Sequence, residues 1–347
     1  MARIVSKGYS FDDVLVIPKY NRVESRRDVS FKTMVTKRHS LDIPFVVANM
    51  DTVCESEMAI TIGKMGGLGV IHRFMTIKEQ VKEIQKVKKH NLLTAAAVGV
   101  KDYEERAKAL SDIGTDIFVL DVAHGHSKRV GKTLDYIKKN FPRIDVMVGN
   151  IATKDAAEYF INKKADAIKV GIGPGSMCTT RLMAGAGVPQ ITAIMDVYEA
   201  SQGRAPVCAD GGIKISGDIV KAIGAGADTV MIGSLFSGTK ESPGKIINKN
   251  GKKYKEYRGM ASYLATVKKM ALDGVKKEEV VHVEGEMTMT EYKGSVVPIT
   301  NKLLGGLASG MTYMGAENIE KIKGKADFIS VTGAGIKESI AHGLFNN

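Results

Sequence analysis

The pattern that decides the fold occurs three times: GTDIFVLD at residues 114–121, KADAIKVG at 164–171 and GADTVMIG at 226–233. Each copy consists of a helix end, a small residue, an aspartate and then an apolar run. Short apolar runs without alternation are typical of strands that are buried on both faces, as the strands of parallel sheets are. The repeat therefore predicts parallel strands that alternate with helices.

Further runs of this kind bring the number of predicted strands to eight. The segments between them show helical periodicity, as in TIKEQVKEIQKVKKH at residues 76–90. Alternation of strand and helix repeated eight times is the signature of a (β/α)8 TIM barrel, an α/β fold. The candidate strands are FVVANMD (45–51), LGVIH (68–72), TAAAVGV (94–100), DIFVLD (116–121), DVMVGN (145–150), DAIKVG (166–171), PVCADGG (206–212) and DTVMIG (228–233).

A doubly wound sheet is the alternative α/β architecture, but its glycine fingerprint follows the first strand. Here the glycine-rich loop GIGPGSMCTTR, residues 171–181, follows the sixth predicted strand. Ser176 also stands where a dinucleotide fingerprint has its third glycine. We therefore favour the barrel and do not interpret this loop as a dinucleotide-binding turn.

Composition is typical of a globular protein of the cytoplasm. The 347 residues are 44% apolar, and no apolar run approaches the roughly 20 residues of a membrane span. The N-terminus lacks the apolar core of a secretory signal. The chain has 3 cysteines without close pairing, which argues against a disulfide framework and fits a reducing compartment.

The net charge of +12 is compatible with nucleic acid, an acidic membrane or anionic small ligands as partners. The lysines, however, are scattered among acidic residues in helical stretches such as residues 78–90 and 132–140, and aromatic residues do not alternate with them. We interpret the charge as mostly a solvated outer face that also attracts phosphorylated substrates. The sequence thus predicts neither a membrane nor a nucleic-acid partner.

The stretch after the eighth strand, residues 248–297, is polar, lysine-rich and predicted to be irregular. It is too long for a simple connection, and long insertions at the mouth of a barrel are usually lids or binding loops. We expect a partly ordered flap rather than a disordered spacer. No linker separates a second domain, so residues 1–347 are predicted to form one catalytic barrel domain.

Polar residues follow the predicted strands at their carboxyl ends, where a TIM barrel builds its active site. Taken singly, Asn49 and His72 are more typical of hydrogen-bonded core residues than of ligands. Together, polar groups at one end of so many buried strands predict a site. In chain order they are Asn49, Asp51, His72, the segment DVAHGHS (121–127), Asn150, the Cys178 loop, Asp210-Gly211-Gly212 and Gly233-Ser234.

Strands seven and eight end in DGG (210–212) and GS (233–234), which favours a phosphate site. Glycine lets backbone N–H groups approach a phosphate closely, and barrels frequently bind phosphate at these two strands. Asp210 then lies where a ribose attached to that phosphate would present its hydroxyls. The alternative is that these glycines only form turns.

Cys178 lies in the glycine-rich loop that faces the predicted site. A thiolate there can attack an electrophilic carbon and form a covalent intermediate. Thr179, Thr180 and Arg181 supply hydroxyls and a cation beside it. A small buried hydrophobe is the alternative role, and it is the one we assign to Cys54 and Cys208, which lie in or beside apolar elements.

Three motifs identify a resemblance that covers nearly the whole chain. GIGPGSMCTTRLMAGAGVPQITAI, ADGGIKISGDIVKAIGAGADTVMIGSLFSGTKESPG and ANMDTV resemble the family of IMP dehydrogenases and GMP reductases. The resemblance implies a (β/α)8 barrel that forms a homotetramer. It also implies that the loop cysteine attacks C2 of a purine nucleotide, GMP or IMP, and that a nicotinamide cofactor exchanges hydride at that carbon.

The same resemblance implies roles for individual residues. Cys178 would be the nucleophile, and Asp210 would hold the ribose hydroxyls. Beyond these two, it implies phosphate contacts from Ser176, Gly212, Gly233, Ser234 and Tyr257, purine contacts from Gly259 and Met260, cofactor contacts from Asp121, Asn150, Gly171 and Gly173, and a monovalent cation such as K⁺ on the carbonyls of Gly173, Gly175 and Cys178.

Two departures from the family pattern bear on the activity. Residues 70–100 run on without the regulatory tandem (CBS) domain that many IMP dehydrogenases carry after strand two. Dehydrogenases also carry an Arg-Tyr pair in the flap, where the arginine activates water, but this chain has no arginine between Gly259 and Gly285. VEGEMTMTEYKGSV (283–296) instead resembles the reductase flap, in which a glutamate, here Glu284, works with the second loop threonine, Thr180.

The flap therefore favours reductive deamination of GMP to IMP and ammonia with NADPH. The body of the barrel resembles bacterial dehydrogenases more closely, so an IMP dehydrogenase (IMP and NAD to XMP) with a rebuilt flap is the alternative. In that case a lysine of TVKKMALDGVKK (266–277) would replace the missing arginine. A third hypothesis is a catalytically silent relative that binds nucleotide or nucleic acid; intact Cys178, Thr180 and Glu284 argue against it.

Overall fold

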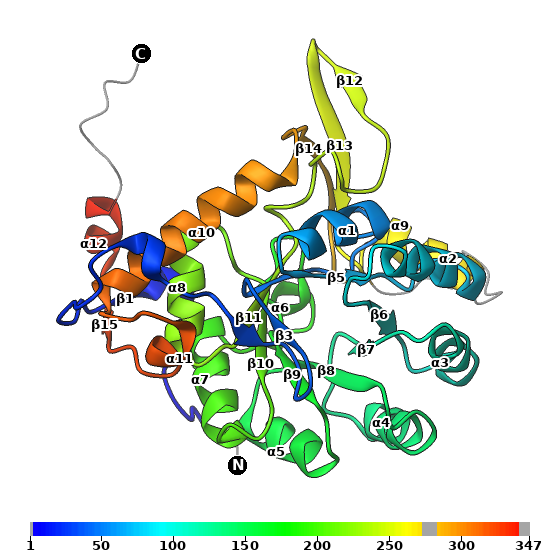
Figure 1. The fold of residues 1–347 in the computed structure, drawn as a ribbon, viewed down its shortest axis with the longest axis horizontal. Helices are drawn as coiled ribbons and strands as arrows, with labels where there is room; N and C mark the ends of the chain where they lie inside the picture. The colour runs from blue at the N-terminus through cyan, green and yellow to red at the C-terminus, as the bar shows by residue number, and fades with distance from the viewer. Residues whose placement is uncertain (1–2, 273–282, 340–347) are drawn as a thin grey trace.

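A closed barrel of eight parallel strands forms the centre of the molecule, with β11 pairing with β4 to complete the ring (Figure 1). The structure is a computed structural model that describes residues 3–272 and 283–339. Each of the eight predicted strands is present, so the predicted TIM barrel is confirmed. The strands are β4 (Phe45–Val47), β5 (Leu68–Ile71), β6 (Ala95–Val98), β7 (Ile117–Asp121), β8 (Asp145–Ile151), β9 (Ala167–Val170), β10 (Val207–Asp210) and β11 (Thr229–Ile232).

The barrel strands are apolar without alternation because both of their faces are buried. In β7, Ile117 and Val119 belong to one apolar cluster, and Phe118 and Leu120 belong to a second, larger cluster. Successive side chains of a strand point to opposite faces, so the first cluster fills the barrel and the second packs between strands and helices. All four side chains are fully buried.

Helices cover the outside of the barrel (Figure 1). The chain passes from β5 to α2 through residues 72–76, and α2 begins with a capping box in which Thr76 and Glu79 exchange hydrogen bonds. The helices are α1 (Ser56–Lys64), α2 (Ile77–Lys88), α3 (Tyr103–Asp112), α4 (Lys128–Asn140), α5 (Lys154–Asn162), α6 (Thr180–Met183), α7 (Gln190–Ser201), α8 (Ser216–Ala225), α10 (Val296–Tyr313), α11 (Ile319–Ile322) and α12 (Gly333–Glu338).

Segments near the two ends of the chain form two small sheets outside the barrel, which the sequence analysis did not predict. Strand β1 (Val14–Val16) pairs antiparallel with β15 (Phe328–Ser330). The short hairpin of β2 (Thr33–Met34) and β3 (Ser40–Leu41) contacts the amino end of β8, where Asp145 accepts hydrogen bonds from Thr36 and Arg38. The 3-10 helix η1 (Phe11–Asp13) precedes β1, and a second one, η2 (Arg26–Asp28), lies between β1 and β2.

The flap after β11 is more regular than its composition suggested. An antiparallel sheet joins β12 (Ile247–Lys249), β13 (Lys252–Arg258) and β14 (Met287–Glu291), and α9 (Tyr263–Leu272) follows β13. The prediction of irregular chain over 248–297 was therefore wrong for the described part, because cross-strand pairing organises polar residues that show no apolar pattern. Over residues 3–272 and 283–339, no helix is both long enough and apolar enough to cross a membrane.

Candidate active site

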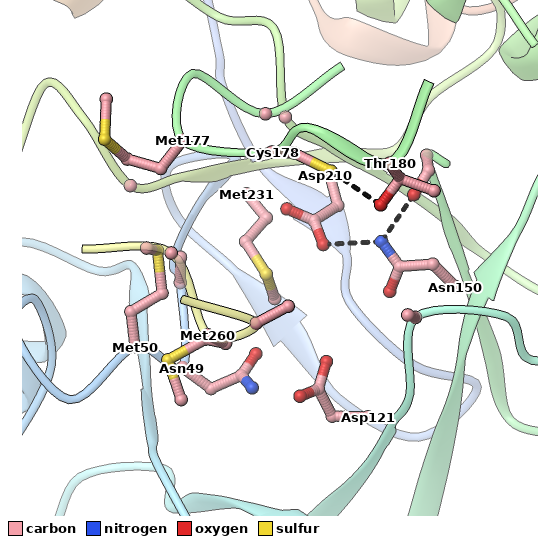
Figure 2. A pocket seen from close by; sticks show the side chains of 18 of the residues that line it. Asn49, Met50, Asp121, Asn150, Met177, Cys178, Thr180, Asp210, Met231 and Met260 are labelled. Carbon is pink, nitrogen blue, oxygen red and sulfur yellow. Dashed lines mark hydrogen bonds between the residues drawn. The ribbon is translucent and has the colours of Figure 1, made fainter. Parts of the chain in front are cut away.

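A cavity of about 570 Å³ opens at the carboxyl ends of the barrel strands, and the cysteine loop and the flap form its other walls (Figure 2). Its volume lies in the range of small-molecule sites. Every residue that the sequence analysis assigned to catalysis, substrate, cofactor or cation lines this cavity. These residues are Asp121, Asn150, Gly171, Gly173, Gly175, Ser176, Cys178, Thr180, Asp210, Gly212, Gly233, Ser234, Tyr257, Gly259, Met260 and Glu284.

Two of the glycines in the cysteine loop lie too close to neighbouring atoms to carry a side chain. A Cβ at Gly171 (φ +147°) would lie 2.1 Å from the carbonyl oxygen of Asp210, and one at Gly173 (φ +87°) would lie 2.5 Å from Cγ of Arg181. Arg181 is not among the residues that line the cavity. Its guanidinium donates to the carbonyl of Val188 at 2.6 Å, so it braces the loop instead of placing a cation beside the thiol.

A hydrogen-bonded chain of three side chains crosses from the loop to the flap. The Cys178 thiol donates to the Thr180 hydroxyl over 3.1 Å, and that hydroxyl donates to Oε2 of Glu284 over 2.7 Å. Backbone contacts hold the two segments together, because Cys178 forms an antiparallel bridge with Gly285 and the Thr179 N–H donates to the Glu284 carbonyl at 3.0 Å. The chain can pass a proton between the flap and the neighbourhood of the thiol.

The other two cysteines occupy a different environment. Cys178 is exposed, whereas Cys54 and Cys208 are buried. Burial raises the pKa of the Cys54 thiol and raises that of Cys208 to about 12. Both therefore remain protonated thiols near neutral pH, and Cys178 is the cysteine that lines the cavity.

Hydroxyls and glycine backbone gather at the side of the cavity next to β10 and β11. Ser176 Oγ lies 2.9 Å from the Tyr257 hydroxyl, and Gly211 and Gly212 both have positive φ, at +91° and +84°. Burial raises the pKa of Tyr257, although its hydrogen bond to Ser176 acts in the opposite direction. A neutral phenol, a serine hydroxyl and approachable backbone N–H groups suit a phosphate.

A buried lysine that the sequence analysis missed lies under this region. Lys169, in the middle of β9, contacts Asp210 at 2.9 Å and Asp121 at 3.1 Å, and it also donates to the side-chain oxygen of Asn150. Asn150 in turn donates to Asp210 at 2.9 Å (Figure 2). The only sequence signal was a single lysine within an otherwise apolar strand.

The charges in this network stabilise one another. Burial acts against the charged form of Lys169, but Asp210 and Asp121 outweigh it and raise the lysine pKa. Burial likewise acts against ionised Asp121, but Lys169 and Arg73 lower its pKa overall. Lys169 and Asp121 are therefore both charged at neutral pH.

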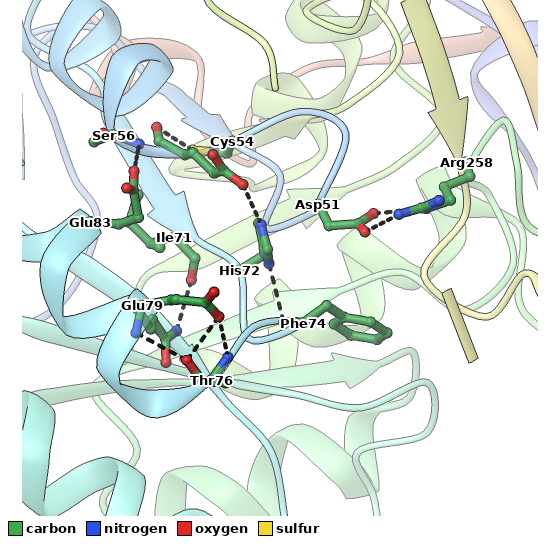
Figure 3. Close-up of polar contacts among 12 residues, drawn as sticks. Asp51, Cys54, Ser56, Ile71, His72, Phe74, Thr76, Glu79, Glu83 and Arg258 are labelled. Atoms are coloured by element: carbon green, nitrogen blue, oxygen red, sulfur yellow. Dashed lines mark hydrogen bonds and ion pairs between the residues drawn. The ribbon is translucent and has the colours of Figure 1, made fainter. Parts of the chain in front are cut away.

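Some of the polar strand-end residues predicted for the site, among them Asp51 and His72, do not line the cavity. Asp51 pairs with Arg258 at the end of β13, and His72 lies 3.2 Å from Glu55 and accepts a hydrogen bond from the backbone N–H of Phe74 (Figure 3). His124 and His126 are also absent from the lining. Asn49, which precedes Asp51 by two positions, does line the cavity.

The Asp51–Arg258 pair fixes the base of the flap, so Asp51→Ala should destabilise the protein. The Asp51 carboxylate is fully buried, and removing one partner of a buried ion pair costs about 3–5 kcal/mol. Urea unfolding measures this change. Glu256→Gln is the matched control, because Glu256 is half exposed and lies 3.8 Å from the same guanidinium; we expect a change below about 1 kcal/mol. Equal losses for the two variants would contradict the anchoring role.

The wall formed by the ends of β4 to β8 suits a nicotinamide cofactor. Asn49, Arg73 and Lys101 line it beside Asp121 and Asn150. Arg73 Nε is buried and, among the described residues, makes no hydrogen bond, so a cofactor acceptor would satisfy it.

A monovalent cation would depend on carbonyl oxygens of the loop. Over the described parts of the chain, no cluster of His, Cys, Asp and Glu side chains suits a metal ion. The Gly175 carbonyl accepts from the Cys178 N–H at 3.0 Å, which closes the turn that presents the carbonyls of Gly173, Gly175 and Cys178. A carbonyl oxygen has two lone pairs, so this bond leaves Gly175 able to bind a cation.

Comparison with known proteins gives consistent matches over nearly the full chain. A family model described as "IMP dehydrogenase / GMP reductase domain" matches residues 8–342. The inosine-5′-monophosphate dehydrogenase of Borreliella burgdorferi is 42% identical over 99% of both chains, and the GMP reductase of Leishmania major is 32% identical over 97% of both. A crystal structure of a GMP reductase from Trypanosoma brucei, a cysteine-to-alanine variant in complex with guanosine 5′-monophosphate, has a TM-score of 0.90 and 31% identity over 98% of each chain.

Proposed function

This chain belongs to the IMP dehydrogenase / GMP reductase family of oxidoreductases, and we propose that it is a GMP reductase that converts GMP to IMP and ammonia with NADPH. The observation that carries the proposal is the chain of hydrogen bonds from Cys178 through Thr180 to Glu284. It supports the proposal because the carboxylate of Glu284 would then be an acid–base group one relay away from the nucleophile, as release of an amine requires.

The proposed chemistry uses this relay for the leaving group. The Cys178 thiolate attacks C2 of GMP and forms a C–S bond. The C2–N bond then breaks, and ammonia leaves with a proton from Glu284 that Thr180 relays. When bound, NADPH supplies the hydride that replaces nitrogen at C2. Expulsion of the Cys178 thiolate restores the purine double bond and releases IMP.

An IMP dehydrogenase is the second candidate, favoured by the higher identity to a relative of that name. That reaction hydrolyses the covalent purine, so a base must take a proton from water. The sequence between Gly259 and Gly285 contains no arginine for this role. Two of the lysines that could replace it, Lys276 and Lys277, lie outside the described residues.

The test of the proposal is ammonia release. Purified protein with GMP should sustain ammonia release over many turnovers only when NADPH is added, with one ammonia for each cofactor oxidised. No ammonia from GMP, together with XMP from IMP and NAD, would support the dehydrogenase. No product from either pair would support a silent nucleotide-binding relative.

Further features are proposed with this function. Asp121, Asn150, Gly171 and Gly173 would contact the cofactor, and a monovalent cation such as K⁺ would bind the loop carbonyls. We also propose one catalytic domain without a CBS insertion, assembly as a homotetramer and a cytoplasmic location. These features rest on the family resemblance and on the cysteine content of the sequence.

Asp210→Asn should weaken nucleotide binding more than it slows the chemistry. The change replaces a charged acceptor by an amide, and a charge-assisted hydrogen bond contributes roughly 1.5–3 kcal/mol. We therefore expect the Kd for GMP to rise by roughly 10- to 150-fold with a smaller change in kcat. Titration calorimetry measures the Kd. A variant that binds GMP as tightly as the parent would remove Asp210 from the ribose site.

A further inference from the structure

Lys169 is a fully buried cation in the middle of a barrel strand, with about 1% of its surface exposed. Removing an ammonium group from water costs several kcal/mol unless its partners compensate. An apolar residue would fill this position in the strand at no such cost. The groups that contact the ammonium must therefore account for the presence of a lysine at this buried position.

The partners of Lys169 fix the floor of the nucleotide site. Its ammonium group contacts Oδ2 of Asp210 at 2.9 Å and Oδ1 of Asp121 at 3.1 Å, and it donates to Oδ1 of Asn150. The Asn150 amide then donates to Oδ2 of Asp210 at 2.9 Å and to the Gly171 carbonyl at 2.7 Å. Both bonds to Asp210 end on Oδ2, so the carboxylate is held in one orientation with Oδ1 left for a ligand.

We propose that Lys169 is a positioning residue that acts through Asp210 and thereby sets the preference of this site for ribonucleotides over deoxyribonucleotides. The inference rests on the proposed role of Asp210 as the ribose ligand. Without the ammonium group, the two partly buried carboxylates of Asp121 and Asp210 lose the cation that they share. Oδ2 of Asp210 then keeps only the hydrogen bond from Asn150, so the carboxylate is no longer held in one orientation and becomes a weaker acceptor for a sugar hydroxyl.

The test is sugar discrimination, measured as the ratio of Kd values for 2′-deoxy-GMP or 3′-deoxy-GMP to that for GMP. In the parent, the analogue that lacks the bound hydroxyl should bind roughly 10- to 150-fold more weakly, the range for a hydrogen bond to a charged acceptor. In Lys169→Met the ratio should fall below about threefold. Lys169→Arg restores the charge and should recover at least about a third of the parent ratio.

Two controls separate this role from a general loss of stability. Lys323→Met removes another lysine that pairs with a buried aspartate, Asp228 at 2.7 Å, at the amino end of β11. It should lower the melting temperature and leave the ratio unchanged. If Lys169→Met does not fold, Lys169→Met with Asp121→Asn removes one of the two carboxylates, and Asp121→Asn alone serves as its reference.

A Lys169→Met ratio equal to that of the parent would overturn the inference. So would a parent protein that binds ribo- and deoxyribonucleotides equally, because Asp210 would then not be the ribose ligand. If the parent binds IMP and not GMP, the inosine series gives the same ratio. In that case the assignment as a GMP reductase fails while the role of Lys169 is still decided.

Discussion

Replacing Cys178 by alanine should reduce turnover by roughly 10³-fold or more while the Kd for GMP changes by less than about tenfold. In the proposed mechanism the chemistry depends on the Cys178 thiolate, and the other two cysteines, Cys54 and Cys208, are buried. The proposed nucleotide contacts are separate from it: the hydroxyls of Ser176 and Tyr257 and the carboxylate of Asp210, which line the same cavity. Steady-state kinetics and calorimetry on the same preparation measure the two quantities.

Cys208→Ala is the matched control for this prediction. It also removes a thiol, but from a buried position inside the barrel, so it should lower stability and leave the kcat of the folded fraction close to that of the parent. If Cys178→Ala keeps more than a few per cent of parent activity, the covalent mechanism is wrong.

Replacing Glu284 by glutamine should lower kcat by roughly 10²–10⁴-fold, the usual range for a lost acid–base group. Ammonia leaves C2 poorly unless its nitrogen is protonated, and glutamine cannot supply that proton. The side chain keeps its size and can still bond to Thr180, now 2.7 Å away, so the KM for GMP should change far less. Stopped-flow kinetics under single-turnover conditions separates the steps.

The partial reaction distinguishes a proton donor from a purine ligand. With IMP and the oxidised cofactor, the Glu284→Gln variant should still transfer hydride in a single turnover, because that step expels no ammonia. Glu286→Gln makes the same change on an exposed flap residue two positions along and should have little effect on either step. Equal loss of hydride transfer and deamination in Glu284→Gln would assign Glu284 to purine binding.

The barrel was predictable from the sequence because each strand carries its own signal. The run from Ile117 to Leu120 is apolar on both faces, and the same pattern recurs at Ile168 and Val230 with helical periodicity between. The location of the site could be predicted from the fold, because the parallel strands of a closed barrel bring their carboxyl ends together. Polar residues at those ends, such as Asn150 and Asp210, therefore meet although they lie 60 positions apart.

Other features depend on contacts that no local pattern encodes. Asp51 follows strand β4 much as Asp210 ends strand β10, but Asp51 pairs with Arg258 from the flap and does not line the cavity. Lys169 looked like an isolated polar residue, because its three partners come from three other strands. The flap sheet escaped prediction since pairing with β14 organises β13, whose sequence KKYKEYR has no apolar face.

The activity itself is tested most directly by following the near-ultraviolet absorbance of the nicotinamide cofactor in two reactions on one preparation. With GMP and NADPH, the GMP reductase assignment predicts loss of the reduced-cofactor absorbance, with IMP as the product. With IMP and NAD, it predicts no sustained formation of reduced cofactor and no XMP. Steady formation of reduced cofactor and XMP from IMP and NAD, with no change in the presence of GMP and NADPH, would contradict it.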